Sequence, residues 1–312
     1  MTFIIAEVGS NFRTVDDCLR SVDVAKECGA DAVKFQAYTH GDLYGPVGDY
    51  GMKMAGELTI GWLSALRERA DAAGLELMCT AFSPDLVRAV DPFVSRHKVA
   101  SSDLNYPQLL HAVAKAGKPA YLSTGAADEK EIELALGHFG LCAVTLMYCV
   151  AAYPAAFADL AVMEDLRGWP VPVGFSDHTL GISMAVEASR QGATAIEKHF
   201  TAFPDLDTPD RPHSVKPNEF KRMVDAIRGT RKPCIGPTQE EVDMLLRHKR
   251  RLVATRAIPE GGILKYGENF GAFRSLVNDT RGLSPHNWAF VNGKAAARAL
   301  AVGEAIGAQD WR

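Results

Sequence analysis

The chain has 312 residues, with 34 lysines and arginines against 38 aspartates and glutamates, so its formal net charge is −4. Hydrophobic residues make up 47% and charged residues 23%, which is typical of soluble globular proteins and argues against a disordered chain. The mildly acidic balance gives no electrostatic support for binding nucleic acid or a membrane surface.

Short apolar runs alternate with amphipathic stretches over roughly the first 230 residues, and each run predicts a buried β-strand. The amphipathic stretches include helices predicted at 15–28, 60–73 and 216–227. Glycines 29, 74, 117 and 192 follow helical patterns, where a left-handed cap favours glycine. The predicted strands are 3–8, 32–36, 76–80, 97–101, 119–124, 143–149, 172–177 and 195–201.

Eight successive βα units, with strands too apolar for a sheet exposed on one face, predict a closed (β/α)8 TIM barrel. A doubly wound open sheet is the alternative fold. Such a sheet usually carries a G-x-G-x-x-G turn after its first strand. Here the turn has the sequence Gly9-Ser10-Asn11-Phe12-Arg13, which lacks that motif. The length also fits a barrel of roughly 250 residues with a small additional domain.

The C-terminal part of the chain predicts a second, smaller domain. We expect a barrel over residues 1–230, a proline- and glycine-punctuated linker over 231–247 and a β domain over 248–312 that docks on a barrel. The segments 254–261 and 296–303 share alanine, arginine, alanine, a branched apolar residue and glycine at the same offsets. This echo predicts two short strands, each followed by a glycine turn, in a pseudo-symmetric domain.

The N-terminus and the cysteines predict a cytoplasmic protein. The chain begins without a basic segment and reaches Glu7 too early for a signal peptide, and no apolar run approaches the ~20 residues of a membrane span. The six cysteines form no C-x-x-C pair, so we expect reduced thiols.

Polar residues lie at the predicted carboxyl ends of the strands, where barrel enzymes place their active sites. A buried parallel strand is otherwise apolar, so each polar end costs stability unless a ligand binds it. Two lysines and several hydroxyls predict a surface for a small anion that carries phosphate or carboxylate groups. The residues are Glu7, Lys34, Gln36, Thr80, Lys98, Ser101, Ser123, Thr124, Ser176, Asp177, His178, Glu197, Lys198 and His199.

Two of these residues, His178 and His199, lie one βα unit apart at the ends of neighbouring strands. Two such imidazoles can share a divalent metal ion and leave positions open for substrate and water. A pair of histidines can also be a general base and a packing residue. With Glu7 across the barrel, the sequence favours a metal site.

Five motifs carry a family resemblance: I-I-A-E-V-G-S-N at 4–11, A-D-A-V-K-F-Q at 30–36, L-S-T-G at 122–125, G-F-S-D-H-T-L-G at 174–181 and I-E-K-H-F-T at 196–201. Together with 251–262 and 292–298, they resemble the sialic acid synthase (N-acetylneuraminate synthase) family and its antifreeze-like (SAF) domain. The likeness covers essentially the whole chain in the right order. S-D-H-T-L-G followed one βα unit later by E-K-H-F-T is a highly specific pair.

The resemblance implies a condensation of phosphoenolpyruvate with the open-chain aldehyde of an N-acetylated amino sugar, which yields a nonulosonic 2-keto-3-deoxy acid and phosphate. His178 and His199 would hold Mn²⁺ or Mg²⁺, which polarises the aldehyde and positions the attacking water. Glu7 would orient the aldehyde and that water and take part in proton transfer. Phosphoenolpyruvate would be bound by Lys34, Lys98, Thr80, Ser101, Ser123 and Ser176.

The resemblance also implies which residues face the sugar and how two chains combine. Gln36, Tyr153 and Asp210 would contact the sugar. The family forms a domain-swapped homodimer in which an arginine of the small domain reaches the N-acyl group of the sugar in the other chain. Arg274 aligns with that arginine.

The sequence departs from the family pattern around the rim of the predicted site. Phe12 follows Asn11 where the family usually has histidine, and Ala151 stands where it commonly has asparagine. An aromatic residue of the small domain aligns near His248. Precursors of legionaminate-, pseudaminate- or spore-coat-type sugars therefore fit as acceptors as well as N-acetylmannosamine does.

Two other functions compete with the synthase. A Schiff-base aldolase would use Lys34 or Lys98 as its nucleophile, and the paired histidines argue against it. A non-catalytic sugar-binding paralogue is motivated by Phe12 and Ala151, but such a protein tends to lose costly buried polar groups. Other residues are expected to be surface, capping or packing residues: His40, His97, His111, His138, His213 and Trp62. Arg211 and His213 stand beside Asp210, so a contact with ligand is the alternative there, in a loop too irregular to predict.

Overall fold

The structure is a computed structural model that describes residues 1–45, 56–229, 249–274 and 282–312. The chain divides into two compact units, Met1–Pro233 and Cys234–Arg312. The linker predicted over 231–247 and the position of His248 lie outside the described residues.

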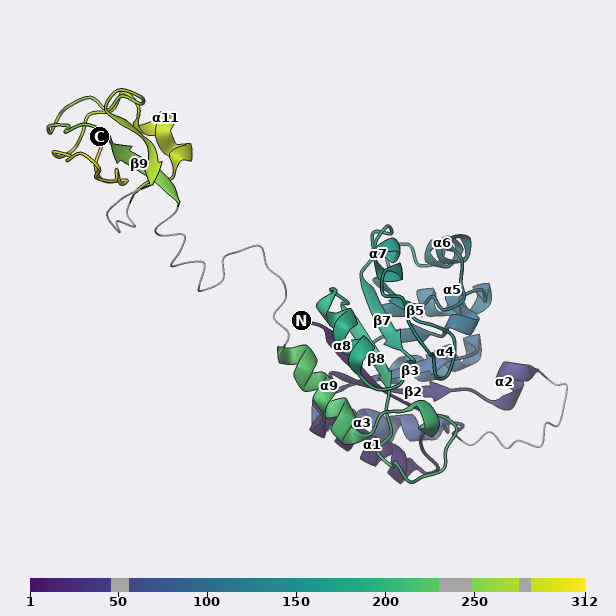
Figure 1. The fold of residues 1–312 in the computed structure, drawn as a ribbon. Helices are drawn as coiled ribbons and strands as arrows, with labels where there is room; N and C mark the ends of the chain where they lie inside the picture. Colours follow the sequence, from purple (N-terminus) through teal and green to yellow (C-terminus); the bar gives the residue numbers. More distant parts are fainter. Residues whose placement is uncertain (46–55, 230–248, 275–281) are drawn as a thin grey trace. The chain divides into compact units, whose positions relative to one another are not determined.

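The first unit is a closed barrel in which all neighbouring strands are parallel (Figure 1). The prediction of a (β/α)8 barrel is therefore confirmed, and an open sheet is excluded, because β1 pairs with both β2 and β8. The strands are β1 (Phe3–Gly9), β2 (Ala32–Ala37), β3 (Glu76–Ala81), β4 (His97–Val99), β5 (Ala120–Ser123), β6 (Val144–Tyr148), β7 (Val173–Asp177) and β8 (Ala195–His199).

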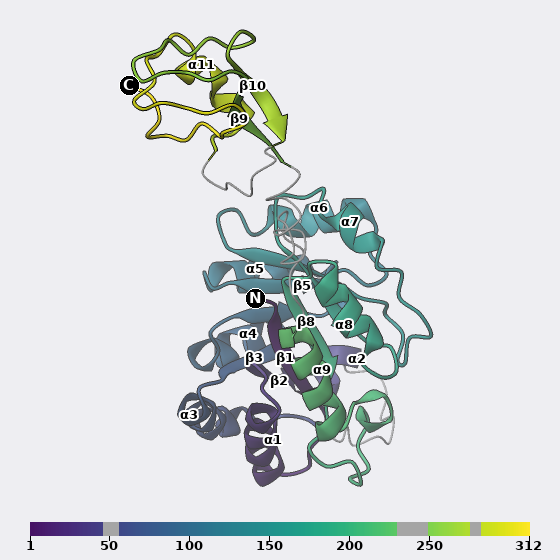
Figure 2. The same cartoon turned by 60° about the vertical axis from the view of Figure 1, so that its left-hand side comes forward.

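Helices alternate with the strands and lie around the outside of the barrel (Figures 1 and 2). The predicted glycine caps are confirmed, since glycines 29, 74, 117 and 192 all have positive φ. None of the described helices is long and apolar enough to cross a membrane. The helices are α1 (Val15–Glu27), α2 (His40–Tyr44), α3 (Leu63–Ala73), α4 (Pro84–Val90), α5 (Pro107–Lys115), α6 (Glu129–Gly137), α7 (Val162–Leu166), α8 (Ser183–Arg190) and α9 (Pro217–Gly229).

Two hydrophobic cores hold the barrel together. The larger core lies between the strands and the helices. A smaller cluster forms a floor of inward-facing residues, and Gly174 makes room for it, because a Cβ there would lie 2.5 Å from the Met147 sulfur. Beyond this floor the inward positions become polar, which places the site above it. The buried residues of this apolar floor are Ile5, Ala32, Met78, Tyr121, Met147 and Ala195.

The second unit has its own small core around an antiparallel pair, β9 (Arg250–Ala254) and β10 (Phe270–Arg274). The unit also contains the short helix α11 (Trp288–Val291). The expectation of a strand in each echo segment is wrong: β9 ends at Ala254, where the first segment begins, and both segments then pair only at isolated bridges such as Ile258 with Leu300. A separate strand, β10, supplies the partner of β9.

The pseudo-symmetry predicted from the echo is nevertheless present in the hydrogen bonds. Ile258 and Leu300 occupy the same offset in the two segments and exchange both backbone hydrogen bonds, at 2.9 and 2.8 Å. The two turn glycines, which both have positive φ, donate reciprocally at 2.8 Å, Gly261 to the Ala296 carbonyl and Gly303 to the Ala254 carbonyl.

The described cysteines are free thiols, namely Cys18, Cys28, Cys79, Cys142 and Cys149, while Cys234 lies outside the described residues. The expectation that His97 is a surface or capping residue is wrong. Its side chain is buried in β4, and its Nε2 lies 3.0 Å from Asp91 Oδ1. Strand β4 has only three residues, so the alternation of inward and outward side chains is too short to predict which way His97 points.

Phe12 belongs to the outer core rather than to the rim of the barrel. Its side chain is 1% exposed, and its ring makes edge contacts with Phe35 and Trp62 at centroid distances of 6.0 and 6.3 Å. The packing role expected for Trp62 is thereby confirmed. Phe12 joins the helical layer around α1 and α3 to strand β2.

We expect Phe12→Ala to lower the free energy of unfolding by about 3–5 kcal/mol, because it removes a buried aromatic ring and leaves a cavity. Urea denaturation measures this loss, and Phe12→Leu serves as the control with a smaller loss. A variant of unchanged stability with altered substrate affinity would contradict a packing role for Phe12.

Candidate active site

A cavity of about 420 Å³ lies at the carboxyl ends of the barrel strands. Every residue of the first unit to which the resemblance gives a role in binding metal, phosphoenolpyruvate or sugar lines this cavity. Arg274, the remaining candidate, is the last residue of β10 in the second unit, and its contact with a substrate stays a prediction. The lining consists of Glu7, Lys34, Gln36, Thr80, Phe82, Lys98, Ala100, Ser101, Ser102, Ser123, Ala151, Tyr153, Ser176, His178, Glu197, His199 and Asp210.

Strand register explains how residues far apart in sequence meet in this cavity. Glu7 of β1 stands opposite Lys34 of β2 on one side and His199 of β8 on the other. Ser176 of β7 stands opposite Glu197 of β8. Because side chains alternate along a strand, these positions all point inward above the apolar floor, His199 two steps above it and the others one step.

Lys34 lies between two buried carboxylates. Its Nζ is 2.8 Å from Glu7 Oε2 and 3.7 Å from Glu197 Oε2, and it donates to Thr80 Oγ1 at 2.8 Å. Gln36 Nε2 donates to the other oxygen of Glu7 at 2.7 Å. This network fixes Glu7 in the middle of the cavity wall.

The two carboxyl groups around Lys34 differ in acidity. Burial, reinforced by the charge of Glu197, raises the pKa of Glu7 to about 7 despite the ion pair with Lys34. Burial alone would also raise the pKa of Glu197, but Lys34 and Lys98 outweigh it and lower that pKa to about 2. Glu7 can therefore exchange a proton near neutral pH while Glu197 stays ionised.

Lys98 is a buried cation without a close counter-charge. Its side chain is 4% exposed, and its Nζ donates to Ser123 Oγ at 2.6 Å and to the Val99 carbonyl at 3.0 Å. Among the described residues, no carboxylate oxygen lies within 4.0 Å of this nitrogen. Burial lowers the pKa of Lys98. A buried ammonium group held by a hydroxyl and a carbonyl suits an anionic ligand.

The two histidines predicted to bind metal are neutral at pH 7. Burial lowers the pKa of His178 to about 4 and that of His199 to about 3. The Nδ1 of His178 lies 2.7 Å from the Val150 carbonyl, which makes Nδ1–H the donor and leaves Nε2 with its lone pair. A neutral imidazole whose other nitrogen bonds a carbonyl is the usual form of a metal-ligating histidine.

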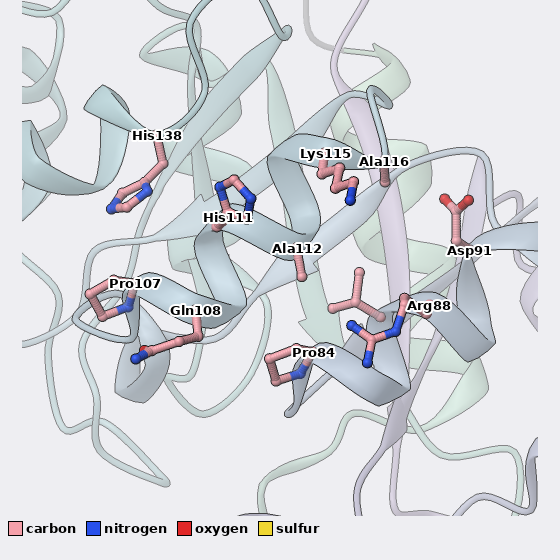
Figure 3. Close-up of a pocket in the computed structure, with 11 residues that line it drawn as sticks. Pro84, Arg88, Asp91, Pro107, Gln108, His111, Ala112, Lys115, Ala116 and His138 are labelled. Atoms are coloured by element: carbon pink, nitrogen blue, oxygen red, sulfur yellow. The ribbon is translucent and has the colours of Figure 1, made fainter.

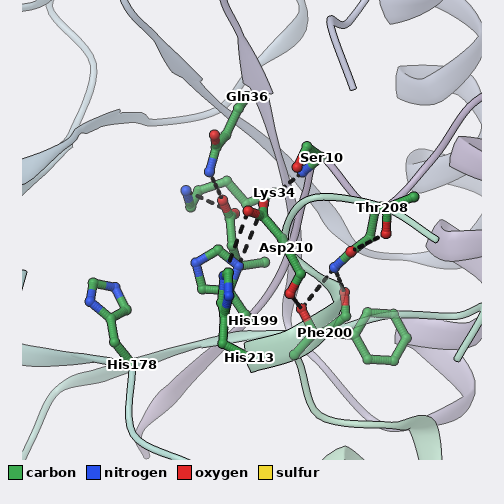
Figure 4. Close-up of polar contacts among 12 residues, drawn as sticks. Ser10, Lys34, Gln36, His178, His199, Phe200, Thr208, Asp210 and His213 are labelled. Atoms are coloured by element: carbon green, nitrogen blue, oxygen red, sulfur yellow. Dashed lines mark hydrogen bonds and ion pairs between the residues drawn. The ribbon is translucent and has the colours of Figure 1, made fainter. Parts of the chain in front are cut away.

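His213 also belongs to the site, so the expectation that it is a surface or capping residue is wrong. It ends a 3-10 turn, Arg211–His213, and its side chain is 10% exposed. Its ring lies 4.7 Å from the His199 ring, with Asp210 beside both (Figure 4). The ring of Tyr153 covers this group, with centroids 4.2 Å from His178 and 5.2 Å from His213.

The loop that carries Asp210 is held by the end of β1. The Ser10 amide donates to Asp210 Oδ2 at 2.8 Å, and Ser214 Oγ donates to the Asp210 carbonyl at 2.7 Å. Asn11 Nδ2 donates to the same Ser214 hydroxyl at 2.8 Å. Gly9 permits this approach, since its φ is +58° and a Cβ there would lie 2.1 Å from Asp210 Oδ2.

The structure separates the polar strand-end residues that the sequence predicted as one ring. Glu197 lines the cavity and accepts a hydrogen bond from Ser176 at 3.0 Å, as its spacing of two from His199 indicates. Thr124, Asp177 and Lys198 lie outside the lining, and the last two form a fully buried ion pair at 2.9 Å. His213 lies in a loop that no periodicity describes.

The departures from the family pattern fall in different places. Phe12 is not part of the cavity lining. Ala151 lines the cavity and also an adjoining pocket of about 320 Å³ that includes Asn105 and Gly125. The change at Ala151 therefore lies where it can affect a ligand, whereas the change at Phe12 is a packing substitution.

A larger cavity of about 830 Å³ lies elsewhere, on the outer helices α4 and α5 (Figure 3). Its lining includes Arg88, Asp91 and the exposed His111, and it contains none of the strand-end residues. Size alone therefore does not identify the active site. The smaller cavity has the buried ionisable groups.

Comparison with known proteins gives a consistent picture. The model of the NeuB family matches residues 21–236. A protein of Methanocaldococcus jannaschii is 38% identical over 84% of this chain and 82% of its own length. The N,N'-diacetyllegionaminic acid synthase of Legionella pneumophila is 30% identical over 97% of this chain and 93% of its own. The solved N-acetylneuraminic acid (sialic acid) synthetase of Leptospira borgpetersenii, in complex with citrate, superposes with a TM-score of 0.73 at 30% identity, covering 80% of this chain and 93% of that one.

The raised pKa of Glu7 makes stability depend on pH. Between the ordinary value of 4.5 and about 7, the folded protein holds a proton that the unfolded chain releases, so stability falls as pH rises through this window. We expect the parent to lose about 2 kcal/mol more than Glu7→Gln between pH 5 and pH 7. Urea denaturation at both pH values measures this, and equal losses would contradict the raised pKa.

Proposed function

Because this chain belongs to the NeuB family, we propose that it is a synthase that condenses phosphoenolpyruvate with an N-acetylated amino sugar to give a nonulosonic acid and phosphate. The match over residues 21–236 confirms the family resemblance predicted from the sequence. The relatives named as legionaminic acid synthase and sialic acid synthetase support an enzyme of this class.

The observation that carries the proposal is the buried charge of Lys98 in the cavity wall, which has no carboxylate oxygen within 4.0 Å among the described residues. Lys98 and Lys34 stand on nearby strands, and hydroxyls from β3, β5, β7 and the turn after β4 face the same space. Phosphoenolpyruvate carries a phosphate and a carboxylate, so it supplies the negative charge that this wall lacks. The hydroxyls are those of Thr80, Ser101, Ser123 and Ser176.

The donor set on the other side of the cavity fits a divalent metal ion. His178 and His199 are neutral, and the buried Nδ1 of His199 has no hydrogen-bond partner. We infer that these histidines hold Mn²⁺ or Mg²⁺. When bound, such an ion acts as a Lewis acid toward the aldehyde of the sugar.

The remaining residues orient the two substrates. Lys34 and Lys98 hold phosphoenolpyruvate so that its enol carbon faces the aldehyde, which replaces a bimolecular encounter by a fixed geometry. Glu7, with a pKa of about 7, exchanges the proton that the reaction moves at neutral pH. Gln36, Tyr153 and Asp210 line the part of the cavity left for the sugar.

The reaction balances without a covalent enzyme intermediate. The C3 carbon of phosphoenolpyruvate forms a bond to the aldehyde carbon, and the aldehyde oxygen takes up a proton to become a hydroxyl. Water adds to C2, and one of its two protons balances the proton taken up by the aldehyde oxygen. When the C2–O bond to phosphate breaks, the C2 hydroxyl gives its remaining proton to the departing phosphate, which leaves the 2-keto group and inorganic phosphate.

The acceptor is proposed as a class rather than as one sugar. Relatives named for legionaminic and sialic acids both align over most of this chain. Ala151 enlarges the lining next to the adjoining pocket, so a di-N-acetylated deoxy sugar fits the proposal as well as N-acetylmannosamine does. We further propose a domain-swapped homodimer in the cytoplasm, in which Arg274 of each chain binds the N-acyl group held by the other.

The first test is phosphate release from phosphoenolpyruvate with Mn²⁺, against a panel of N-acetylated hexosamines and di-N-acetylated deoxy sugars. We expect release that requires both a sugar and a metal and that EDTA abolishes. His199→Ala should fall below about 1% of the parent rate, since loss of a ligand exceeds the 10–100-fold effect of outer contacts.

His138→Ala, which changes an exposed histidine of the first unit, is the matched control and should keep the parent rate. Chelator-insensitive turnover with borohydride trapping of Lys34 or Lys98 would replace the synthase by a Schiff-base aldolase. Metal and ligand binding without any phosphate release across the panel would favour the non-catalytic paralogue.

Arg274→Ala tests the proposed role of the small domain. One charged hydrogen bond contributes about 1.5–3 kcal/mol, so the KM for sugar should rise at least about tenfold while the KM for phosphoenolpyruvate stays unchanged. Mixed dimers of His199→Ala and Arg274→Ala chains should recover activity if domains are swapped, because one site then has both residues intact. No recovery in mixed dimers would contradict the swap.

A further inference from the structure

A carboxylate stands between two imidazoles where β8 passes into the following loop. Asp210 Oδ2 lies 3.8 Å from His199 Nδ1, and Asp210 Oδ1 lies 3.6 Å from His213 Nε2 (Figure 4). One ligand atom from each of the three residues lies within 4.8 Å of the other two. Among the residues that the structure describes, no other group of three or more His, Cys, Asp or Glu side chains meets this criterion.

The two ring nitrogens that face Asp210 lack partners. His199 Nδ1 and His213 Nε2 are both buried without a hydrogen bond, and their distances to the carboxylate exceed hydrogen-bond length. The side chains are only 7% and 10% exposed, so water does not readily satisfy them. Two buried unsatisfied nitrogens each cost about 1–3 kcal/mol, which is a large penalty unless a ligand fills the gap.

An ion pair does not account for this arrangement. The separations of 3.8 Å and 3.6 Å are longer than the about 2.7–2.9 Å of a charge-assisted hydrogen bond, so neither ring forms a close ion pair with the carboxylate. Neutral imidazoles and a carboxylate are, however, the donors that divalent transition metals prefer. The separation of the three groups leaves space for an ion among them.

We propose that His199, Asp210 and His213 together bind a divalent transition-metal ion, with His213 as a ligand that the paired-histidine prediction does not contain. The inference rests on the proposed function in that the ion is the one held there by His178 and His199, and it adds Asp210 and His213 to the ligands of that ion. His178 stands at the neighbouring strand end, outside the group of three. Two nitrogens and one carboxylate select Mn²⁺, Fe²⁺, Co²⁺ or Zn²⁺ over Mg²⁺, which prefers all-oxygen sites.

The surroundings support a built site with an open side. The Ser10 amide holds Asp210 Oδ2 at 2.8 Å, which orients the carboxylate as outer contacts of metal ligands do. His199 and Asp210 line the cavity, so the ion would face bound substrate. Tyr153 lies in the loop after β6 and covers both histidine rings. Its ring centroid is 5.7 Å from that of His199 and 5.2 Å from that of His213.

The test measures metal binding without substrates, on full-length protein stripped by EDTA. Mn²⁺ and Co²⁺ are titrated calorimetrically into the parent, His213→Gln and Asp210→Asn, with His138→Ala as the control for an exposed histidine. We expect His213→Gln and Asp210→Asn to weaken binding at least about 10–100-fold and the control to bind as the parent does. Binding by His213→Gln with parent affinity would overturn the proposal.

A count of coordinated histidines separates a ligand from a residue that only positions one. Pulsed electron paramagnetic resonance of Mn²⁺ bound to protein labelled with ¹⁵N-histidine reports each coordinated imidazole. We expect His213→Gln to lose one such signal relative to the parent, and an unchanged count would overturn the proposal even if affinity falls. If His213→Gln does not fold, the count is made on parent protein with ¹⁴N- and ¹⁵N-histidine, where fewer than three coordinated histidines overturn the proposal.

Failure of this inference is distinguishable from failure of the synthase. Phosphate release by the parent tests the function alone, whereas the binding and resonance measurements need no substrate. Turnover together with a histidine count that His213→Gln leaves unchanged rejects only the ligand assignment. A count that falls with His213→Gln supports the ligand assignment whether or not the parent releases phosphate.

Discussion

The interior of the barrel can hold charge because its buried cations and carboxylates face one another from neighbouring strands. Lys34 lies between Glu7 and Glu197, and none of the three side chains is more than 6% exposed. Desolvation of each ion costs several kcal/mol, and only the opposite charge on the next strand offsets it. The shared register of β1, β2 and β8 is therefore a condition for the site, since a shift of one residue would turn each side chain outward.

This constraint divides the cavity into two chemically different halves. The walls from β3 to β5 carry Lys98 and hydroxyls, and they suit an anion. The walls from β7 and β8 carry neutral imidazoles, and the loop after β8 adds Asp210 and His213 to them. Glu7 of β1 stands between the two halves with a pKa near neutrality. The proposed reaction, which joins an anionic donor to a carbonyl, would use this separation, because an ammonium group next to a bound metal ion would compete with that ion for the carboxylates.

Membership in the NeuB family and the residues of the cavity indicate the same class of reaction. Neither of them defines a single acceptor sugar. The residues that surround the anion-binding wall come from strand ends, which the barrel fixes rigidly. The residues near the proposed sugar come from loops, as Tyr153, Ala151 and Asp210 do. Loops on a fixed scaffold change specificity without changing the chemistry, which is how barrel enzymes diversify.

The sequence by itself determined the barrel, the identity of its strands and the polar ring at their carboxyl ends. An apolar run such as that of β1, and a polar residue near its carboxyl end such as Glu7, are local patterns of the sequence. Closure of the parallel sheet then brings the carboxyl ends of all the strands to one place. Only the tertiary structure decided that Phe12 packs in the core, that Lys198 points away from the cavity while Glu197 points into it, and that His213 joins His199. The direction of a side chain in a loop depends on contacts with distant segments, such as the Ser10 amide that holds Asp210, and no local period encodes such contacts.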